Sequence, residues 1–238
     1  MWKAKIITAY PGMFPGILGQ SIIGKALSEN IWSLDTINLH DFGYNDRHNI
    51  DDSPFGGGPG MVIRPDVVEQ AVISFIDNIE KNIPLVYMTP SGKSLKQQDL
   101  VNFSQKKGIV ILCGRFEGID SRVIDSLGFE QISIGDYVLT GGEVAAQVLV
   151  EGCVRLLPEV LGHSKSILEE SFSDNLLENP QYTRPKVWVH KKGEEHHVPD
   201  ILVSGHHEKI KKWRQNKSVE LTKRFRPDLL KKSKKAKN

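Results

Sequence analysis

Glycine-bearing segments are the part of this sequence whose spacing most clearly suggests ligand chemistry. Tyr87–Gly92, Cys113–Asp120 and Ile134–Gly142 follow short apolar runs, and Pro54–Met61 lies in a loop-like stretch. Glycine directly after a strand lets the backbone approach a ligand closely or adopt a positive φ. Each segment alone could be a tight turn. Several at the strand ends of one small domain predict a shared ligand pocket, although the pattern does not identify the ligand.

Known nucleotide-binding motifs do not account for these glycines. Gly19–Ala26 nearly matches the phosphate loop of nucleotide hydrolases, but Ala26 replaces the Ser or Thr whose hydroxyl would hold magnesium. An ordinary helix is therefore the better interpretation of that segment. The glycines of Pro54–Met61 do not follow the G-x-G-x-x-G pattern of dinucleotide binding.

Histidine and cysteine spacing indicates neither a metal site nor a disulfide. The histidine pairs at 196–197 and 206–207 are adjacent in sequence, and adjacent residues on a helix or strand do not share a face. Cys113 and Cys153 are far apart and outside any C-x-x-C spacing. We therefore assign no metal ligands, and the two cysteines fit a protein of the reducing cytoplasm.

An α/β framework is expected to position the glycine segments. Helical periodicity extends over Arg64–Lys81 and Leu95–Lys106, and Pro65 suits the start of a helix. Strands that alternate with helices favour a mainly parallel sheet, whose ligand loops gather at the carboxyl ends of its strands. The apolar, β-branched runs that predict strands are Ala4–Thr8, Leu34–Leu39, Leu85–Thr89, Ile109–Cys113 and Gln131–Ile134.

Length and composition are those of a soluble protein. The 238 residues, 39% hydrophobic and 25% charged, suffice for one large domain with its own core and a smaller appendage. No stretch approaches the roughly 20 apolar residues that span a bilayer. The N-terminal segment also lacks the pattern of a signal peptide. A membrane location is therefore not expected.

Charge is distributed unevenly along the chain. The segment Lys209–Asn238 holds 13 Lys/Arg against two acids, which leaves 18 basic and 27 acidic residues in the rest of the chain. A basic extension on an acidic body indicates an anionic partner, of which a phosphate backbone is the commonest. Trp213 and Phe225 lie among these cations, where they could stack on bases or form the buried stripe of a small helical domain.

The texture of the sequence changes after Pro158. Gly162–Pro180 is polar and acidic with little periodicity, which is typical of a linker, and a helical pattern returns from Asp200. The predicted organisation is an α/β domain over 1–161, a linker over 162–180 and a small basic helical domain over 181–238.

Five ordered motifs resemble the bacterial tRNA (guanine-N1-)-methyltransferases, and the similarity extends from Met1 to about Pro227. This family belongs to the SPOUT superfamily, so the resemblance implies an α/β fold with a deep trefoil knot. General folding rules alone would not predict a knot, because true knots are rare exceptions. The motifs are DRH-x₂-DDSPFGGGPGM from Asp46, CGRFEGID from Cys113, SIGDYVLTGGE from Ser133, LPEVLGH from Leu157 and YTRP from Tyr182.

The resemblance implies S-adenosylmethionine as the methyl donor and assigns residues to its pocket. Backbone groups in strand-end loops can bind the adenine edge, and the carboxylate of Glu117 suits the cationic sulfonium. Glu117 could instead form a structural ion pair with Arg115 or Arg122. The implied cofactor-binding residues are Tyr87, Met88, Thr89, Pro90, Gly114, Glu117, Ile134, Gly135, Asp136, Tyr137, Val138, Leu139, Gly141 and Gly142.

The implied reaction methylates N1 of guanosine 37 in a tRNA that carries guanosine at position 36, which gives 1-methylguanosine. Guanine N1 holds a proton at neutral pH, so a base must remove it and a cation should stabilise the charge on O6. By the resemblance this cation is Arg155, for which a phosphate or helix-end contact is the alternative interpretation.

The general base is where the sequence departs from the family. The aspartate that the family carries in its linker corresponds to Glu170, whose additional methylene changes the reach of the carboxylate. We predict Glu170 as the base, with Glu169 and Asp174 as alternatives. All three could instead be solvated acids of the linker.

The resemblance also implies a tRNA partner and an obligate homodimer. The cofactor pocket of one chain would meet the linker and C-terminal domain of the other chain at an interfacial active site. Magnesium matters in the family, but no ligand cluster in the sequence predicts a site for it. Residues expected to contact RNA, or else to shape the active-site loop, are Asp46, Arg47, Asp52, Gly56, Gly57 and Gly58.

Two other functions are compatible with parts of this pattern. A knotted methyltransferase that modifies a ribose hydroxyl or an rRNA base would place its carboxylate and arginine differently. A catalytically silent RNA-binding protein would not bind the cofactor. The intact cofactor segments, together with Arg155 and a linker carboxylate, favour the tRNA guanine-N1 enzyme.

Overall fold

The computed structural model describes residues 1–76, 83–161, 171–172 and 175–230. The chain folds into two compact units, Met1–Gly162 and His163–Asn238, which are described one at a time. No helix within the described ranges is both long and apolar enough to cross a bilayer.

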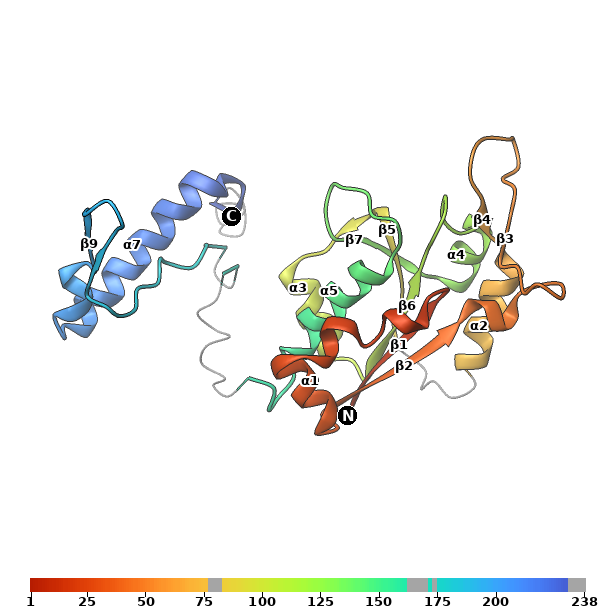
Figure 1. The fold of residues 1–238 in the computed structure, drawn as a ribbon, viewed down its shortest axis with the longest axis horizontal. Helices are drawn as coiled ribbons and strands as arrows, with labels where there is room; N and C mark the ends of the chain where they lie inside the picture. The colour runs from red at the N-terminus through yellow and green to blue at the C-terminus, as the bar shows by residue number, and fades with distance from the viewer. Residues whose placement is uncertain (77–82, 162–170, 173–174, 231–238) are drawn as a thin grey trace, which may run out of the picture. The chain divides into compact units, whose positions relative to one another are not determined.

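A five-stranded, fully parallel sheet forms the centre of the first unit (Figure 1). Its spatial order is β2-β1-β6-β5-β7, so the chain crosses over the sheet between sequential strands. β6 is buried along its whole length because strands pack on both of its edges and helices cover both of its faces. The strands are β1 (Trp2–Thr8), β2 (Trp32–Asn38), β5 (Leu85–Ser94), β6 (Gly108–Cys113) and β7 (Glu130–Ser133).

Two buried clusters, one on each side of the sheet, make up the hydrophobic core. Ile111 belongs to one cluster and its strand neighbour Leu112 to the other, as expected for alternating faces of a strand. The first cluster is completed by α1 (Ser21–Ser28), α3 (Gln97–Ser104) and α5 (Glu143–Val154). The second is completed by η3 (Leu39–Phe42), α2 (Pro65–Ile76) and α4 (Ser121–Leu127).

Short elements connect this framework. A hairpin-like pair of two-residue strands, β3 and β4, carries a glycine-rich loop that projects from the unit (Figure 1). The short elements are η1 (Pro11–Met13), η2 (Gly16–Gly19), β3 (Asp51–Asp52) and β4 (Val62–Ile63).

The five predicted strands are all present, with ends that shift by a few residues. β5 continues past Thr89 to Ser94 and changes register against β7 between Met88 and Lys93. Ala26 lies in α1, so the near-match to a phosphate loop is an ordinary helix, as expected. The helix predicted over Arg64–Lys81 is seen as α2, and its last positions lie outside the described residues.

Two helices of the first unit were not predicted. α5 is buried on most of its surface, so its sequence lacks the polar face from which helical periodicity is recognised. α4 has only seven residues, bounded by Asp120, whose side chain accepts from the Arg122 amide, and by Gly128 in the left-handed conformation. These capping residues are the signal that could have identified it.

The second unit contains a hairpin as well as helices, so the expectation of a helical C-terminal domain is wrong in this respect. Its apolar residues at 187–189 form a run of only three, which is too short to stand out in the sequence. Of its described residues only Thr222 and Leu229 are buried. Its elements are β8 (Val187–Val189), β9 (Glu195–His197), η4 (Asp200–Val203) and α7 (His207–Phe225).

Candidate active site

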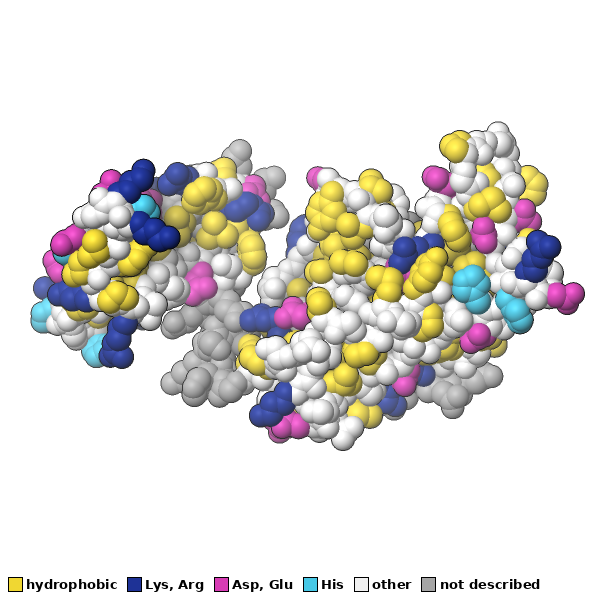
Figure 2. Space-filling model, in the orientation of Figure 1, with side chains coloured by type: hydrophobic (Ala, Val, Ile, Leu, Met, Phe, Trp, Pro, Cys, Tyr) yellow, Lys and Arg dark blue, Asp and Glu magenta, His cyan; other side chains and the backbone are white. Residues whose placement is uncertain are grey.

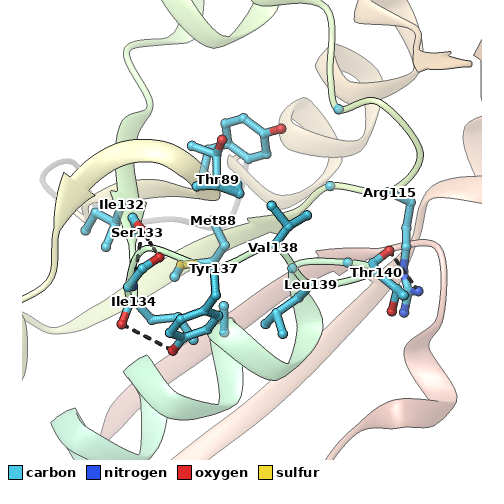
Figure 3. A pocket seen from close by; sticks show the side chains of 18 of the residues that line it. Met88, Thr89, Arg115, Ile132, Ser133, Ile134, Tyr137, Val138, Leu139 and Thr140 are labelled. Atoms are coloured by element: carbon cyan, nitrogen blue, oxygen red, sulfur yellow. Dashed lines mark hydrogen bonds between the residues drawn. The ribbon is translucent and has the colours of Figure 1, made fainter. Parts of the chain in front are cut away.

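A pocket of about 240 Å³ lies at the carboxyl ends of β5, β6 and β7 (Figure 3). This is the edge at which a parallel sheet gathers its ligand loops. Three segments that are far apart in sequence form its walls, together with Ala145 from the first turn of α5. The walls are Tyr87–Pro90, Gly114–Gly118 and the segment from Ile132 to Gly142.

All of the predicted cofactor-binding residues except Asp136 line this one pocket. The side chain of Asp136 is exposed and does not contribute to the lining. The prediction also omitted seven lining residues. Six of them lie within two positions of a predicted residue in the sequence, and this closeness could have identified them. The seventh, Ala145, lies in α5, a helix that was not predicted. The omitted residues are Arg115, Phe116, Gly118, Ile132, Ser133, Thr140 and Ala145.

Two glycines allow the walls of the pocket to approach each other. The Gly142 amide donates a hydrogen bond to the Gly114 carbonyl at 3.0 Å. A Cβ at Gly142 would lie 2.9 Å from the backbone Cα of Cys113, and a Cβ at Gly114 would lie 3.0 Å from the Tyr87 ring. A side chain at Gly142 would therefore push the segment after β7 away from the end of β6, and one at Gly114 would press on the Tyr87 ring of β5.

The segment between β7 and α5 forms an exposed apolar margin of the pocket (Figures 2 and 3). Val138 is 84% exposed, and Tyr137 and Leu139 are also exposed. The Tyr137 hydroxyl donates to the Ile134 carbonyl at 3.3 Å, which holds this segment folded back on itself. The margin therefore offers apolar surface to a ligand larger than the pocket.

Tyr87 is the buried phenol of the site. Burial raises the pKa of its hydroxyl, while hydrogen bonds with Thr89 and the Ile119 backbone act in the opposite direction. The phenol therefore keeps its proton at neutral pH and is available as a hydrogen-bond donor, but not as a general base.

Arg115, which lines the pocket, forms a buried ion pair with Glu143 at the start of α5. The Glu143 side chain is fully buried; its Oε1 accepts from Arg115 Nε at 3.1 Å and from the Thr8 hydroxyl at 2.7 Å. Its Oε2 lies 2.9 Å from Arg115 Nη2, close enough for an ion pair but without hydrogen-bond geometry. The hydrogen bonds to Oε1 therefore orient the carboxylate.

Arg115 connects this carboxylate to the pocket segments. Its Nη1 donates to the Thr140 carbonyl at 3.3 Å, and its guanidinium lies 4.4 Å from the centre of the Tyr10 ring. A side chain at Gly141 would collide with Arg115. The end of β1, the segment after β6 and the start of α5 are thus held together through one side chain.

Glu117 is an exposed carboxylate on the pocket wall. The two arginines considered as its structural partners bind other carboxylates instead, since Arg115 pairs with Glu143 and Arg122 with Asp120. The Glu117 amide donates to the Met61 carbonyl at 2.9 Å, which attaches the pocket wall to the glycine-rich loop.

Arg155 lies away from the pocket in the same chain. It follows the last turn of α5, whereas the pocket adjoins the first turn, and the 12-residue helix places them roughly 18 Å apart along its axis. Arg155 instead lines an open groove of about 500 Å³ with Ile17, Ile22 and Val148. The predicted base Glu170 and its alternatives Glu169 and Asp174 lie outside the described residues.

The predicted RNA contacts are exposed and fall on two loops of the first unit. Asp46 and Arg47 belong to the turn between Tyr44 and Asn49, which pair through an isolated bridge. Asp52 ends β3, and Gly56, Gly57 and Gly58 occupy the loop between β3 and β4.

Neither cysteine can serve as a nucleophile at neutral pH. Burial raises the pKa of Cys153 to about 12 and that of Cys113 well above its ordinary value. Within the described ranges, no group of three or more His, Cys, Asp or Glu side chains could hold a metal ion. The described part of the site thus offers backbone groups, hydroxyls, the Glu117 carboxylate, the Arg115 guanidinium, the buried Tyr87 phenol and apolar surface.

Comparison with known proteins identifies the family to which the chain belongs. The sequence model of the family described as tRNA (Guanine-1)-methyltransferase TrmD matches residues 2–232. A tRNA (guanine-N(1)-)-methyltransferase of Ruegeria sp. (strain TM1040) is 49% identical over 96% of this chain and 92% of its own length. The enzymes of the same description from Rhodospirillum rubrum and Ehrlichia canis are 49% and 48% identical, over 95% of this chain and 92% and 94% of their own lengths. The chain therefore belongs to the tRNA (guanine-N1-)-methyltransferase family and is an enzyme of that activity, with S-adenosylmethionine as the family's methyl donor.

Proposed function

We propose that this enzyme methylates N1 of guanosine 37 in tRNAs that carry guanosine at position 36, using S-adenosylmethionine bound in the pocket at the ends of β5, β6 and β7. The observation that carries this proposal is the convergence of the three strand-end segments on one pocket. The family supplies the class of reaction, and the motif resemblance supplies the position in the tRNA.

The residues of the pocket fit S-adenosylmethionine. Gly114 and Gly142 let the segments after β6 and β7 approach each other closely, so that the strand-end loops can present their other backbone groups to a purine edge. The apolar margin of Tyr137, Val138 and Leu139 suits the adenosine rings, and the carboxylate of Glu117 suits a cationic group. The bound cofactor would supply an activated methyl group, so the protein need not provide a nucleophile.

The protein's own task is to prepare guanine N1 and to hold it in line. We assign proton removal from N1 to Glu170 and stabilisation of the developing charge on O6 to Arg155. Tyr87 and the two thiols keep their protons at neutral pH and cannot take over the role of the base. Glu169 and Asp174 are the alternative bases.

The position of Arg155 supports an active site shared between two copies of the chain. At roughly 18 Å from the pocket along α5, Arg155 cannot reach a guanine that lies beside its own chain's cofactor. The groove that it lines also exposes Ile17, Ile22 and Val148, which a second copy would cover. We infer a homodimer in which Arg155 and Glu170 of one chain act at the cofactor pocket of the other.

We assign the remaining substrate contacts to exposed residues of both units. Asp46, Arg47, Asp52 and the glycines at 56–58 would contact the anticodon loop, and the basic C-terminal unit would contact the phosphate backbone. Cytoplasmic tRNA is the expected substrate, and no role is assigned to magnesium.

We also propose that the pocket segments form the deep trefoil knot of the SPOUT superfamily. The reversed placement of β6 and β5 in the sheet and the contact between Gly114 and Gly142 are compatible with such a path. Pulling the chain from its two ends in a single-molecule experiment tests this. A knotted chain would show an unfolded contour length shorter than 238 residues allow, and a full contour length would refute the knot.

Methyl transfer to two tRNA transcripts tests the proposed reaction. One transcript carries guanosine at 36 and 37, and the matched transcript carries adenosine at 37. We expect 1-methylguanosine in the first transcript only, and a loss of about 10²–10⁴-fold in rate for Glu170→Gln. Wild-type methylation at another position would refute the assigned site, and full activity of Glu170→Gln would move the base to Glu169 or Asp174.

Mixing two inactive variants tests the shared active site. Gly142→Val should block the pocket, and Arg155→Ala should lower the rate by about 10²–10³-fold by analogy with the loss of an oxyanion-stabilising donor. If the site is shared, the mixed dimer contains one pocket and one Arg155 that still meet, so mixing restores activity. If each chain serves its own pocket, the mixture stays inactive.

A further inference from the structure

Phe55 is the most exposed large hydrophobic side chain among the described residues. It is 99% exposed and lies on the loop between β3 and β4, which projects from the first unit (Figure 1). Figure 2 shows hydrophobic side chains at the tip of this projection. A phenylalanine so placed gives no burial energy to the folded chain, so its ring has no structural role that the described residues explain.

The loop around Phe55 is built from glycines that leave it without packing. Gly56, Gly57 and Gly58 have φ values of +89°, +77° and +123°, and a Cβ at any of them would meet no atom within 4 Å. Three consecutive residues with backbone conformations that residues other than glycine rarely adopt form a loop without side chains. The ring of Phe55 is therefore held out beside free space into which a flat ligand could fit.

The base of the same loop is fixed to the cofactor pocket. The Met61 carbonyl accepts from the Glu117 amide at 2.9 Å, and the Gly118 carbonyl accepts from the Ile63 amide at 2.9 Å. A Cβ at Gly60 would lie 2.5 Å from Cγ of Glu117, so the loop and the pocket wall are in direct contact. Anything that approaches the methyl donor along this wall therefore passes the loop.

Beside the loop lies an open groove of about 770 Å³ in which Phe55 is one of the lining residues. The groove also contains two arginines, but each is already paired. Arg64 forms two hydrogen bonds with Asp66, and Arg122 forms two with Asp120. Because these cations are neutralised by their neighbours, the feature that the groove offers to a ligand is an aromatic face rather than a positive charge.

We propose that Phe55 stacks on an unpaired tRNA base next to the guanine that is methylated. Unpaired RNA bases are commonly stacked on aromatic side chains, and such contacts tolerate any base because each has a π face. The occupant follows from the reaction, since the target base must reach the pocket and its neighbours in the anticodon loop then lie beside the pocket wall. The inference rests on the proposed function, and it makes Phe55 a positioning residue for the substrate.

Steady-state kinetics of Phe55→Ala and Phe55→Trp test this role, with Ser53→Ala as a control in the same loop. At saturating S-adenosylmethionine, we expect Phe55→Ala to raise KM for tRNA by about tenfold or more, in line with the loss of one base–aromatic stack. Phe55→Trp should restore KM, and Ser53→Ala should leave it unchanged. Binding of S-adenosylmethionine and the midpoint of thermal unfolding should be the same in all variants, because the ring is exposed.

The outcomes separate this inference from the proposed function. Wild-type enzyme that fails to methylate guanosine 37 would refute the proposed function. Wild-type enzyme that is active, with an unchanged KM in Phe55→Ala, would refute only the stacking role. Phe55→Leu that restores KM as well as Phe55→Trp would replace stacking by a general apolar contact, and a lowered dimer fraction in Phe55→Ala would assign the ring to the contact between chains.

Discussion

The two units of this enzyme use their apolar residues in opposite ways. The first unit, Met1–Gly162, buries two clusters on either side of its sheet, and residues such as Ile111 and Trp32 are inaccessible. The second unit, His163–Asn238, buries only Leu229 and Thr222 among its described residues and leaves Trp188 and Phe225 more than half exposed.

This contrast matches the different features that the two units carry, a pocket in the first and an exposed basic surface in the second. The pocket needs backbone groups in fixed positions, and a close-packed core with a buried ion pair holds them. The second unit carries the basic helix α7 and exposed rings such as the stacked pair of Trp188 and His196. Its surface is suited to gain contacts from a partner, so we expect its order to depend on tRNA or on a second chain.

Thiol modification should show the largest difference between the units. Because burial raises the pKa of Cys153 from 9.0 to about 12, its thiolate fraction at pH 8 is roughly 1,000-fold below that of an ordinary thiol. We expect Cys153 to react with iodoacetamide roughly 1,000-fold more slowly, or slower still, than a cysteine introduced by Ser204→Cys, as measured by peptide mass spectrometry. Equal rates would mean that the first unit opens readily.

The same pKa shift predicts how stability depends on pH. The folded-state pKa of Cys153 lies above its unfolded value. The contribution of the buried thiol to the unfolding free energy is therefore complete below about pH 9 and is lost as the pH rises towards 12. Comparing the unfolding free energies of wild type and Cys153→Ala over this range checks the direction.

Hydrogen exchange should show the next largest contrast. Amides of β6 are buried in the centre of the sheet, whereas those of α7 belong to a helix with one buried side chain. We expect β6 to exchange about 10³-fold more slowly than α7 in the free enzyme. Addition of tRNA should slow exchange in α7 and leave β6 unchanged, and protection of α7 that is high without tRNA would contradict the comparison.

Breaking one ion pair in each unit should lower the unfolding free energy by amounts that differ by about 3 kcal/mol. Glu143→Gln leaves the Arg115 guanidinium without its buried counter-charge and should lower the unfolding free energy by about 3 kcal/mol. It should also weaken S-adenosylmethionine binding, because Arg115 holds the Thr140 carbonyl. Lys217→Gln removes the exposed pair with Glu220 and should cost less than about 0.5 kcal/mol. Urea denaturation and calorimetry measure both effects.

The smallest contrast concerns single methyl groups. Ile111→Val removes one methyl group from the fully buried strand β6 and should cost about 1 kcal/mol. Val189→Ala removes two methyl groups from the exposed strand β8 and should change stability by less than about 0.5 kcal/mol. A larger cost for Val189→Ala in urea denaturation would show that β8 is covered in solution.

Local sequence was sufficient to predict most of the sheet and a shared pocket at the strand ends, whereas the family resemblance supplied most of the lining residues. A run such as Ile109–Cys113 favours burial, because its β-branched and apolar residues fit a covered strand. Glycines placed directly after such runs predicted the pocket for the same local reason. The helix α5 was missed because a helix buried on most sides has no polar face to mark its period.

Partnerships between distant residues were decided only by the path of the chain. Arg115 was considered as a partner for Glu117, two residues away, but it pairs with Glu143, which is 28 residues away. The motif resemblance assigned Arg155 to the active site, whereas the fold places it at the far end of α5 from its own chain's pocket, which is why we propose that a second chain completes the site. Composition and motifs therefore determined the family, the strands and the glycine cradle, because these depend on neighbouring residues. The fold alone decided which charges meet, because an ion pair depends on distance in space and not on distance in sequence.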